Sequence, residues 1–338
     1  MSGTLPPAGG PWGPAEPWPP AGEEEISWEL GALALARGTV DRSTLRRNDA
    51  GWVAATWADP ASRVLVLDKG KALIRISGDR ASLVLVPAAA APAGTRFLLG
   101  TDDEGVAYFG VVAAAAGLEA LLPPGPGEPG TEVRPAGLRE AGPLLGDRDA
   151  GLLTHAVALA NWHESHQHCP RCGAPAEPLP AGHARVCTND GSEHFPRTDP
   201  AVIMLVTDDQ GRCLLARNRR WPARRVSILA GFVEPGESAE QAVVREVAEE
   251  TGIAVGDVRY LGSQPWPMPQ SLMLGFRARA ASGQQIRVDA DEISEARWFT
   301  RDDLRAAMAA GDVLLPPPVS IAHQIIEAWY GAPLPRAW

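Results

Sequence analysis

The sequence has little lysine, few cysteines and no excess of positive charge. Lys69 and Lys71 are its only lysines, so arginine supplies nearly all of the 31 cationic side chains. Acidic side chains number 41, which leaves a formal net charge of −10 over 338 residues. This balance argues against a surface dedicated to duplex nucleic acid, because such surfaces carry an excess of basic residues. A protein of this charge that acts on phosphates needs cations.

Long hydrophobic runs are also absent. Apolar runs such as 106–118 are shorter than the roughly 20 residues that a bilayer-spanning helix needs, so no membrane segment is expected. Residues 1–22 lack the cationic start and the apolar centre of a secretory signal. We therefore expect these residues, which are rich in Pro and Gly, to form a disordered leader.

Only four cysteines occur, and three of them are clustered. This clustering favours a metal site in a reducing cytoplasm over a disulfide framework. Cys169 and Cys172 form one CxxC knuckle, and Cys187 opens a second one in which Asp190 stands at the fourth position. The spacing predicts a structural zinc ion whose fourth ligand is Asp190 or one of three histidines, His168, His183 and His194. A ribbon held by packing alone is the alternative. Cys213 is expected in the core.

Turn residues divide the chain into short elements, since it contains 35 Gly and 32 Pro. Residues 23–160 alternate β-like runs with turns, which predicts a sheet-rich N-terminal domain without a catalytic constellation. Its expected strands lie at 63–67, 72–76, 82–86 and 106–112. A helix-like stretch, 151–162, then leads into a zinc-ribbon-like segment at 161–197.

Residues 198–332 follow a different pattern, in which strong strands are mixed with helices, and a short tail, 333–338, follows them. The expected strands lie at 201–206, 213–218, 226–234, 271–280 and 296–300. The expected helices lie at 239–251, 302–310 and 320–330. This order fits an α+β or α/β/α sandwich better than a doubly wound sheet of repeated βαβ units.

The most informative stretch is 231–253, which carries six Glu and one Arg. Ser238 and Gln241 have the spacing of a capping box, and Gly252 is of the residue type that ends helices, so a helix is predicted at 239–251. Its apolar residues on the other sides are expected to anchor the helix to a sheet: Val244, Val247 and Ala248.

Three carboxylates of this helix share one face, because Glu246, Glu249 and Glu250 stand at positions i, i+3 and i+4. Like charges at this spacing repel one another, so the arrangement favours a divalent cation among them. Hard oxygen ligands indicate Mg²⁺ or Mn²⁺. A solvated acidic helix face is the alternative for an arbitrary group of three glutamates.

The whole stretch resembles the Nudix box, G-x5-E-x7-R-E-U-x-E-E-x-G-U with U an aliphatic residue. Every specified position agrees: Gly231, Glu237, Arg245, Glu246, Val247, Glu249, Glu250, Gly252 and Ile253. The resemblance implies a Nudix hydrolase, an enzyme that cleaves a nucleoside diphosphate linked to another moiety, on an α/β/α sandwich with a mixed sheet. It further implies that Glu246, Glu249 and Glu250 are catalytic metal ligands, with Glu250 as the essential acidic residue. Glu237 and Arg245 would form an internal pair that shapes the loop.

A second resemblance is to NADH pyrophosphatases, which carry a zinc ribbon ahead of the Nudix domain. Residues 263–271, SQPWPMPQS, are similar to the SQPWPFPxS array of enzymes that act on NAD(H), with Met268 in place of Phe. A rigid turn without a ligand is the alternative for this run. Position by position, the resemblance implies substrate contacts from Gln264, Trp266, Ser271, Phe232, Phe195, Glu292 and Ala322, with Glu292 also beside the metal.

The two aromatic residues of this set have distinct implied roles. Phe232 matches a ring that stacks on nicotinamide, and Phe195 matches a ring often supplied by the other subunit, which implies a homodimer. Stacking suits both rings physically, because a flat ring gains by burial between two others. Core packing is the alternative for each Phe.

The function implied by both resemblances is metal-dependent hydrolysis of the NAD(H) pyrophosphate to nicotinamide mononucleotide and AMP in the cytoplasm. The same chemistry on ADP-ribose, on another nucleoside diphosphate derivative, on a nucleoside triphosphate or on NAD-capped RNA is the nearest alternative. A non-catalytic nucleotide sensor or nucleic-acid-binding protein is an alternative from another class.

Overall fold

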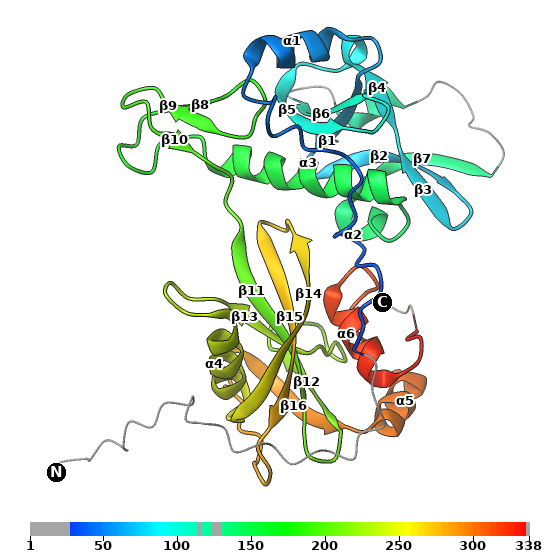
Figure 1. The fold of residues 1–338 in the computed structure, drawn as a ribbon. Helices are drawn as coiled ribbons and strands as arrows, with labels where there is room; N and C mark the ends of the chain where they lie inside the picture. The colour runs from blue at the N-terminus through cyan, green and yellow to red at the C-terminus, as the bar shows by residue number, and fades with distance from the viewer. Residues whose placement is uncertain (1–27, 114–116, 123–129, 336–338) are drawn as a thin grey trace.

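The computed structural model describes residues 28–113, 117–122 and 130–335. The expected leader, 1–22, lies outside the described residues, as do the last three residues of the expected tail. The described chain forms two lobes stacked along the long axis, an N-terminal domain and a C-terminal domain (Figure 1). A small ribbon lies beside the N-terminal domain and leads into the first strand of the C-terminal domain (Figure 1).

The N-terminal domain is built on a seven-stranded sheet in the order β3-β2-β1-β6-β5, with β4 paired to β1 and β7 to β2. Its strands are β1 (Arg63–Asp68), β2 (Lys71–Ser77), β3 (Arg80–Leu83), β4 (Leu85–Pro87), β5 (Gly94–Thr101), β6 (Ala107–Ala113) and β7 (Thr131–Gly137). Its helical segments are α1 (Ala50–Ala58), η1 (Ala88–Ala90), η2 (Leu118–Leu121), α2 (Leu138–Ala141) and α3 (Asp147–Ser165). The predicted sheet-rich domain is therefore confirmed, although β5, β7 and α1 were not anticipated.

Helix α3 lies along the side of this sheet that is nearer to the C-terminal domain (Figure 1). Leu153 and Ala156 of α3 pack in one core with Leu65 and Phe97 of the sheet. The helix then leads into the ribbon, a three-stranded antiparallel sheet of β8 (Ala176–Pro178), β9 (Arg185–Cys187) and β10 (Glu193–His194).

The C-terminal domain is a three-layer sandwich around a six-stranded mixed sheet, in the order β14-β15-β11-β12-β16 with β13 paired to β11. Strand β11 pairs parallel with β15 and antiparallel with β12 and β13. The strands are β11 (Asp199–Thr207), β12 (Cys213–Asn218), β13 (Leu229–Phe232), β14 (Val255–Trp266), β15 (Ser271–Ala280) and β16 (Ile293–Phe299). The helices are α4 (Ala239–Thr251), α5 (Arg301–Ala310) and α6 (Ile321–Tyr330).

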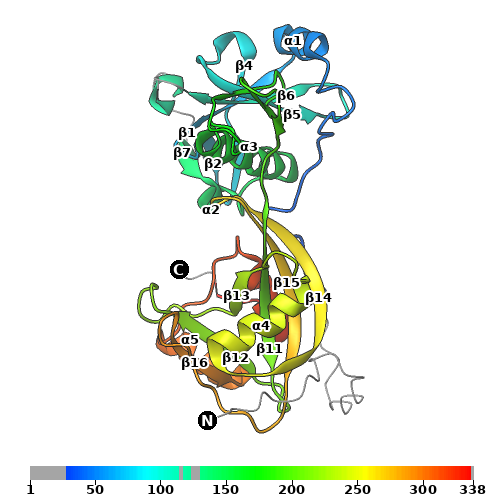
Figure 2. The same cartoon turned by 90° about the vertical axis from the view of Figure 1, so that its left-hand side faces the viewer.

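Helix α4 covers one face of this sheet, and α5 and α6 cover the other (Figures 1 and 2). Successive residues of β11 point to opposite faces. Val202 and Met204 therefore pack in the core under α4, while Ile203 and Leu205 pack in the core under α5 and α6. Burial on both faces explains why this strand reads as an unbroken apolar run. Cys213 is fully buried in the core under α5 and α6, as expected.

The limits of α4 agree with the prediction, but its anchoring face differs. Val247 is buried, whereas Val244 is only half-buried and Ala248 is exposed, so the prediction is wrong for these two residues. Ala242 and Val243 take their place in the core. The helix is rotated so that its buried side extends to Glu250.

Segments distant in sequence join the two lobes. Leu33 packs in the core of the C-terminal domain, whereas Leu35, two residues later, packs in the core of the N-terminal domain. In the opposite direction, Val319 from the loop before α6 enters the N-terminal core. Within the described ranges, no helix has the length and apolarity that crossing a membrane requires.

Candidate functional site

A cleft of about 520 Å³ opens beside α4, and we call it the carboxylate cleft. It gathers residues from four elements and the turn before β16: Ala201, Ala230, Gly231, Phe232, Glu234, Arg245, Glu246, Glu249, Ser271, Met273 and Glu292. The structure thus brings together five residues singled out from the sequence as metal or substrate ligands, Phe232, Glu246, Glu249, Ser271 and Glu292. Strand β13 carries the chain to the cleft, and the turn after it leads into α4.

The approach of β13 to α4 requires glycine at position 231. A Cβ atom built there would lie 1.8 Å from Cδ of Glu246, which is far inside van der Waals contact. The Glu246 carboxyl group therefore lies directly against the backbone of β13. Its position is fixed by packing as well as by charge.

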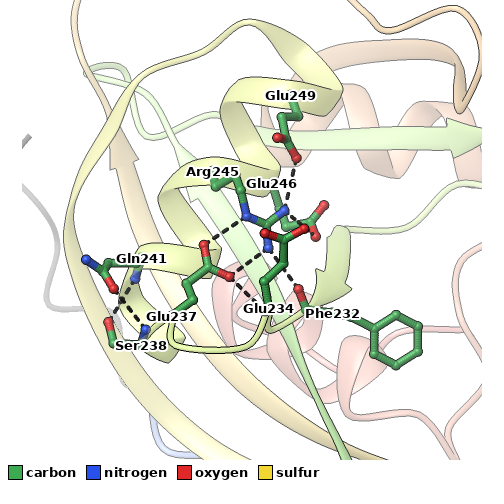
Figure 3. Close-up of polar contacts among 8 residues, drawn as sticks. All are labelled: Phe232, Glu234, Glu237, Ser238, Gln241, Arg245, Glu246 and Glu249. Atoms are coloured by element: carbon green, nitrogen blue, oxygen red, sulfur yellow. Dashed lines mark hydrogen bonds and ion pairs between the residues drawn. The ribbon is translucent and has the colours of Figure 1, made fainter.

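Arg245 is the cation that organises the loop between β13 and α4 (Figure 3). Its Nε and Nη2 atoms each lie 2.8 Å from a carboxylate oxygen of Glu237, in a bidentate pair. Nη2 also donates to the carbonyl oxygen of Phe232 at 2.8 Å. Glu237 in turn accepts a hydrogen bond from the backbone N–H of Glu234 at 3.0 Å. The pair therefore connects both ends of the loop, which is the arrangement inferred for Glu237 and Arg245.

The same guanidinium also reaches two of the cleft carboxylates. Its Nη1 atom lies 2.9 Å from Glu246 Oε1 and 3.0 Å from Glu249 Oε2 (Figure 3). One nitrogen thus compensates part of the charge of Glu246 and Glu249. Burial nevertheless keeps the pKa of Glu246 above its ordinary value, against the lowering effect of Arg245.

Glu250 has no such compensation. Glu250 is 6% exposed, and its Oε2 atom has no hydrogen-bond partner within the described part of the chain. Burial raises the pKa of Glu250 to about 8, and the charges of Glu246, Glu292 and Glu249 add to this effect. A buried carboxylate surrounded by three others fits a divalent cation, because such an ion would satisfy the free oxygen and offset the mutual repulsion.

The raised pKa makes a prediction about stability. Below pH 4.5, the ordinary carboxyl pKa, Glu250 is neutral in both the folded and the unfolded chain. Between pH 4.5 and about 8, Glu250 ionises in the unfolded chain but stays mostly protonated in the folded one. Stability should therefore fall as the pH rises from 5 to 8 in buffer without added divalent ions. Glu250→Gln should remove this part of the slope and melt at a higher temperature than the parent at pH 8. The measurement is thermal unfolding across this pH range.

The matched control is Glu240→Gln, since Glu240 is exposed in the first turn of the same helix. It should keep the pH dependence of the parent. An unchanged slope in Glu250→Gln would show that Glu250 ionises freely in the folded protein.

A second, mostly apolar cavity of about 640 Å³ adjoins the cleft, and both are lined by Ala230 and Met273. The C-terminal domain supplies most of its walls, including Trp221 and residues 314–317 from loops, Trp266 from the end of β14 and Ala322 from α6. The N-terminal domain supplies Arg139 and Glu140 from α2. A nucleotide-sized molecule could therefore place an anionic group in the carboxylate cleft and a flat ring in the apolar cavity.

The segment 264–269 contributes Trp266 to this cavity and is held from both domains. Asn161 of α3 donates its amide N–H groups to the carbonyl oxygens of Pro267 at 2.8 Å and Pro269 at 3.0 Å. The Arg139 guanidinium lies 5.5 Å from the ring centroid of Trp266, and its Nε donates to Met268 Sδ at 3.2 Å. Trp266 and Met268 also pack against the N-terminal core.

Gln264 has a supporting position, which corrects the expected substrate contact. It is fully buried. Its amide group donates to the carbonyl oxygen of Val319 at 3.0 Å and accepts from the N–H of Ile321 at 2.7 Å. These bonds fix the start of α6 and, with it, Ala322 in the cavity wall.

The two Asn161 hydrogen bonds give a second prediction. Asn161→Ala removes two contacts worth about 1 kcal/mol each, which should loosen the segment without unfolding either domain. Hydrogen exchange at the amides of Trp266, Met268 and Gln270 should accelerate by about tenfold or more. Glu164→Ala, on an exposed position of α3, is the control and should leave these rates unchanged. Equal exchange rates in the parent and in Asn161→Ala would show that the segment keeps its conformation without these two hydrogen bonds.

The two phenylalanines occupy different places. Phe232 is 59% exposed and lines the carboxylate cleft, so its ring is accessible for stacking. Phe195 is 63% exposed on the connection from β10 to β11 and lines neither of these two cavities in the described chain. The structure therefore does not bring Phe195 to the site of its own chain.

The ribbon holds the four groups singled out for zinc. The Sγ atoms of Cys169, Cys172 and Cys187 and a carboxylate oxygen of Asp190 all lie within 4.8 Å of one another. Hydrogen bonds from the Ser192 hydroxyl and backbone lower the pKa of Asp190 to about 2, so it is an anion at neutral pH. Three thiols and one carboxylate are a ligand set that zinc accepts.

The histidine alternatives for the fourth ligand fit less well. His183 Nε2 lies 2.8 Å from the carbonyl oxygen of Leu98, and its Nδ1 lies 3.1 Å from Arg47 Nη1, so both ring nitrogens are engaged. Burial lowers the pKa of His183 to about 4, which keeps it neutral. In the described residues, neither His168 nor His194 joins the four clustered groups.

Sequence reasoning missed the contributions of Arg139, Asn161 and Trp221. Trp221 stands in an arginine-rich stretch, 217–225, that matches none of the motifs described above. Arg139 and Asn161 lie in the domain without a catalytic motif, and no local pattern marks them.

Three family models match successive parts of the chain. The NADH pyrophosphatase-like rudimentary NUDIX domain matches residues 61–162, the NADH pyrophosphatase zinc ribbon domain matches 164–195, and the NUDIX domain matches 197–315.

Curated relatives match over most of the chain. A protein of Mycobacterium tuberculosis named NAD-capped RNA hydrolase NudC is 41% identical over 303 residues, which cover 87% of this chain and 94% of the relative. A protein of Homo sapiens, also named an NAD-capped RNA hydrolase, is 42% identical over 197 residues, or 55% of this chain and 42% of that protein. Among solved structures, a NUDIX hydrolase from Nitrosomonas europaea is 19% identical with a TM-score of 0.39, covering 49% of this chain and 94% of its own.

Proposed function

Because the chain belongs to the Nudix hydrolases, in the NADH pyrophosphatase family with a zinc ribbon, we propose that it hydrolyses the pyrophosphate of NAD(H). Water adds to one phosphorus and the bridging P–O bond breaks, which gives nicotinamide mononucleotide and AMP. The same bond occurs in an NAD cap at the 5′ end of RNA, where the products are nicotinamide mononucleotide and a 5′-monophosphorylated RNA. The names of the relatives support this second substrate.

One observation carries the proposal: the carboxylate cleft and the apolar cavity share Ala230 and Met273. A dinucleotide has a charged pyrophosphate between two flat bases. The carboxylate cleft matches the pyrophosphate, and the adjoining apolar cavity matches one of the bases. Phe232 borders the charged space and offers a ring for stacking. The complete set of box carboxylates counts against a non-catalytic sensor.

We propose Mg²⁺ or Mn²⁺ as the catalytic ion, held by carboxylate oxygens of four residues, Glu246, Glu249, Glu250 and Glu292. When bound, the ion neutralises pyrophosphate charge and lowers the pKa of water. Glu250 is the essential acidic residue because it is the most buried carboxylate of the group and the one with a free oxygen. Arg245 holds Glu246 and Glu249 in place, while Glu237 keeps the guanidinium oriented.

The test of this function is hydrolysis of NADH with Mn²⁺ or Mg²⁺, followed by product analysis. The parent should release nicotinamide mononucleotide and AMP, and Glu250→Gln should lower kcat by about 10² to 10⁴. Glu240→Gln, exposed on the same helix, should stay within twofold of the parent. An effect of Glu250→Gln below about threefold would refute the assignment. Parallel assays with NAD⁺, ADP-ribose and capped RNA would rank the substrates.

We also propose a structural zinc ion on Cys169, Cys172, Cys187 and Asp190. Asp190→Ala should lower the zinc content per chain in the presence of a competing chelator, because three ligands bind more weakly than four. His183→Ala is the control for the histidine alternative and should keep its zinc. Full retention of zinc by Asp190→Ala, measured by elemental analysis, would exclude Asp190 from the ligand set.

Two further features belong to this proposal. The exposed Phe195 ring supports a homodimer in which the ring completes the site of the other subunit. The four cysteines are all free thiols, which supports a reducing, cytoplasmic location.

A further inference from the structure

The end of β12 and the connection after it are unusually basic for this acidic chain, and we call residues 217–225 the arginine loop. Its sequence, RNRRWPARR, contains five arginines, one tryptophan and no acidic residue. Arg219, Arg220 and Arg224 are exposed, and Trp221 is 40% exposed. The loop therefore presents cations and an aromatic ring together at the surface.

The positive charge of the arginine loop is only partly compensated. Arg219 Nη1 donates to the carbonyl oxygen of Ala290 at 3.3 Å and lies 3.8 Å from Asp291. Arg224 Nη1 donates to the carbonyl oxygen of Gly311 at 3.2 Å. The Arg220 guanidinium has no partner within the described residues. Besides Asp291, the charged side chains that line the cavities beside the loop are Glu140, Glu295, Asp312, Arg139 and Arg297, so seven cations face four anions. A local excess of three positive charges stands out in a chain of net charge −10.

The arginine loop also borders both parts of the proposed active site. Trp221 and Arg225 line the apolar cavity. The backbone N–H of Arg219 donates to the carbonyl oxygen of Glu292 at 2.8 Å, which ties the loop to the turn that supplies Glu292 to the carboxylate cleft. Arg219 and Arg220, both exposed, directly precede Trp221 in the chain.

We propose that the arginine loop binds the single-stranded 5′ segment of an RNA whose NAD cap lies in the cavity and cleft. A free dinucleotide carries no phosphate beyond its pyrophosphate, so it offers nothing to exposed cations outside the cavity. An RNA continues with one phosphate per nucleotide and with bases that stack on an aromatic ring, and this combination of groove cations and stacking is how proteins hold single strands. The inference rests on the proposed function, which supplies the capped substrate.

The test compares Arg220→Ser/Arg224→Ser with a matched control, Lys71→Ser/Arg80→Ser, which removes two exposed cations from the N-terminal sheet. Neither pair lines the cleft or the apolar cavity. We expect kcat/KM for an NAD-capped single-stranded RNA to fall about tenfold in the loop variant, while its kcat/KM for NADH stays within twofold. The control should match the parent on both substrates. The slope of log affinity against log salt should fall by about 1.4, because two phosphate contacts at about 0.7 each are lost.

Three outcomes would overturn the inference: an unchanged rate on capped RNA, an equal loss on RNA and NADH, or equal hydrolysis of a blunt capped duplex and the single strand. Failure of the proposed function has a different signature, since the parent would then hydrolyse neither substrate. Fluorescence anisotropy of a labelled 5′-monophosphorylated RNA decides that case. Weaker binding by the loop variant than by parent and control supports the loop, and equal binding overturns it.

Discussion

Three of the proposed metal ligands, Glu246, Glu249 and Glu292, line one cleft, and Glu250 is buried next to Glu249 on the same helix. The only guanidinium among the lining residues contacts just two of these four carboxylates. Arg245 lies within 3.0 Å of Glu246 and Glu249, but Glu250 is buried with a free oxygen. An unpartnered buried carboxyl group destabilises a fold. Stability alone therefore does not explain why these carboxylates lie together. Gly231 leaves room for the Glu246 carboxyl group, and Glu237 orients the Arg245 guanidinium. The proposed divalent cation would resolve this conflict.

The N-terminal domain contributes to the apolar cavity through its contacts with the C-terminal domain. It has no catalytic motif of its own, yet Asn161 and Arg139 hold the segment that shapes the apolar cavity. Val319 reaches back into the N-terminal core and connects to the same segment through Gln264. The cavity is therefore a product of both domains, while the carboxylate cleft belongs to the C-terminal domain alone.

Local signals explain what could be predicted from the sequence. The limits of α4 follow from Ser238 and Gly252, whose capping geometry depends only on neighbouring residues. The doubly buried strand β11 is evident from its apolar run. The helix face was harder to predict, because Val244 and Ala248 are as apolar as the residues that anchor α4 and only tertiary packing distinguishes them. The role of Gln264 was misassigned for the same reason: its partners, Val319 and Ile321, lie more than fifty residues away. Strand β14 was missed because Pro and Gly interrupt its pattern.

The central claim is that the cleft carboxylates bind a divalent cation at the expense of a proton on Glu250. Calorimetric titration of Mn²⁺ at pH 7, in two buffers of different ionisation enthalpy, measures the protons released on binding. With a pKa of about 8 before the ion binds, Glu250 should release most of one proton, and Glu250→Gln should release none from this position. Binding with equal proton release in both proteins, or no binding by the parent, would contradict the account.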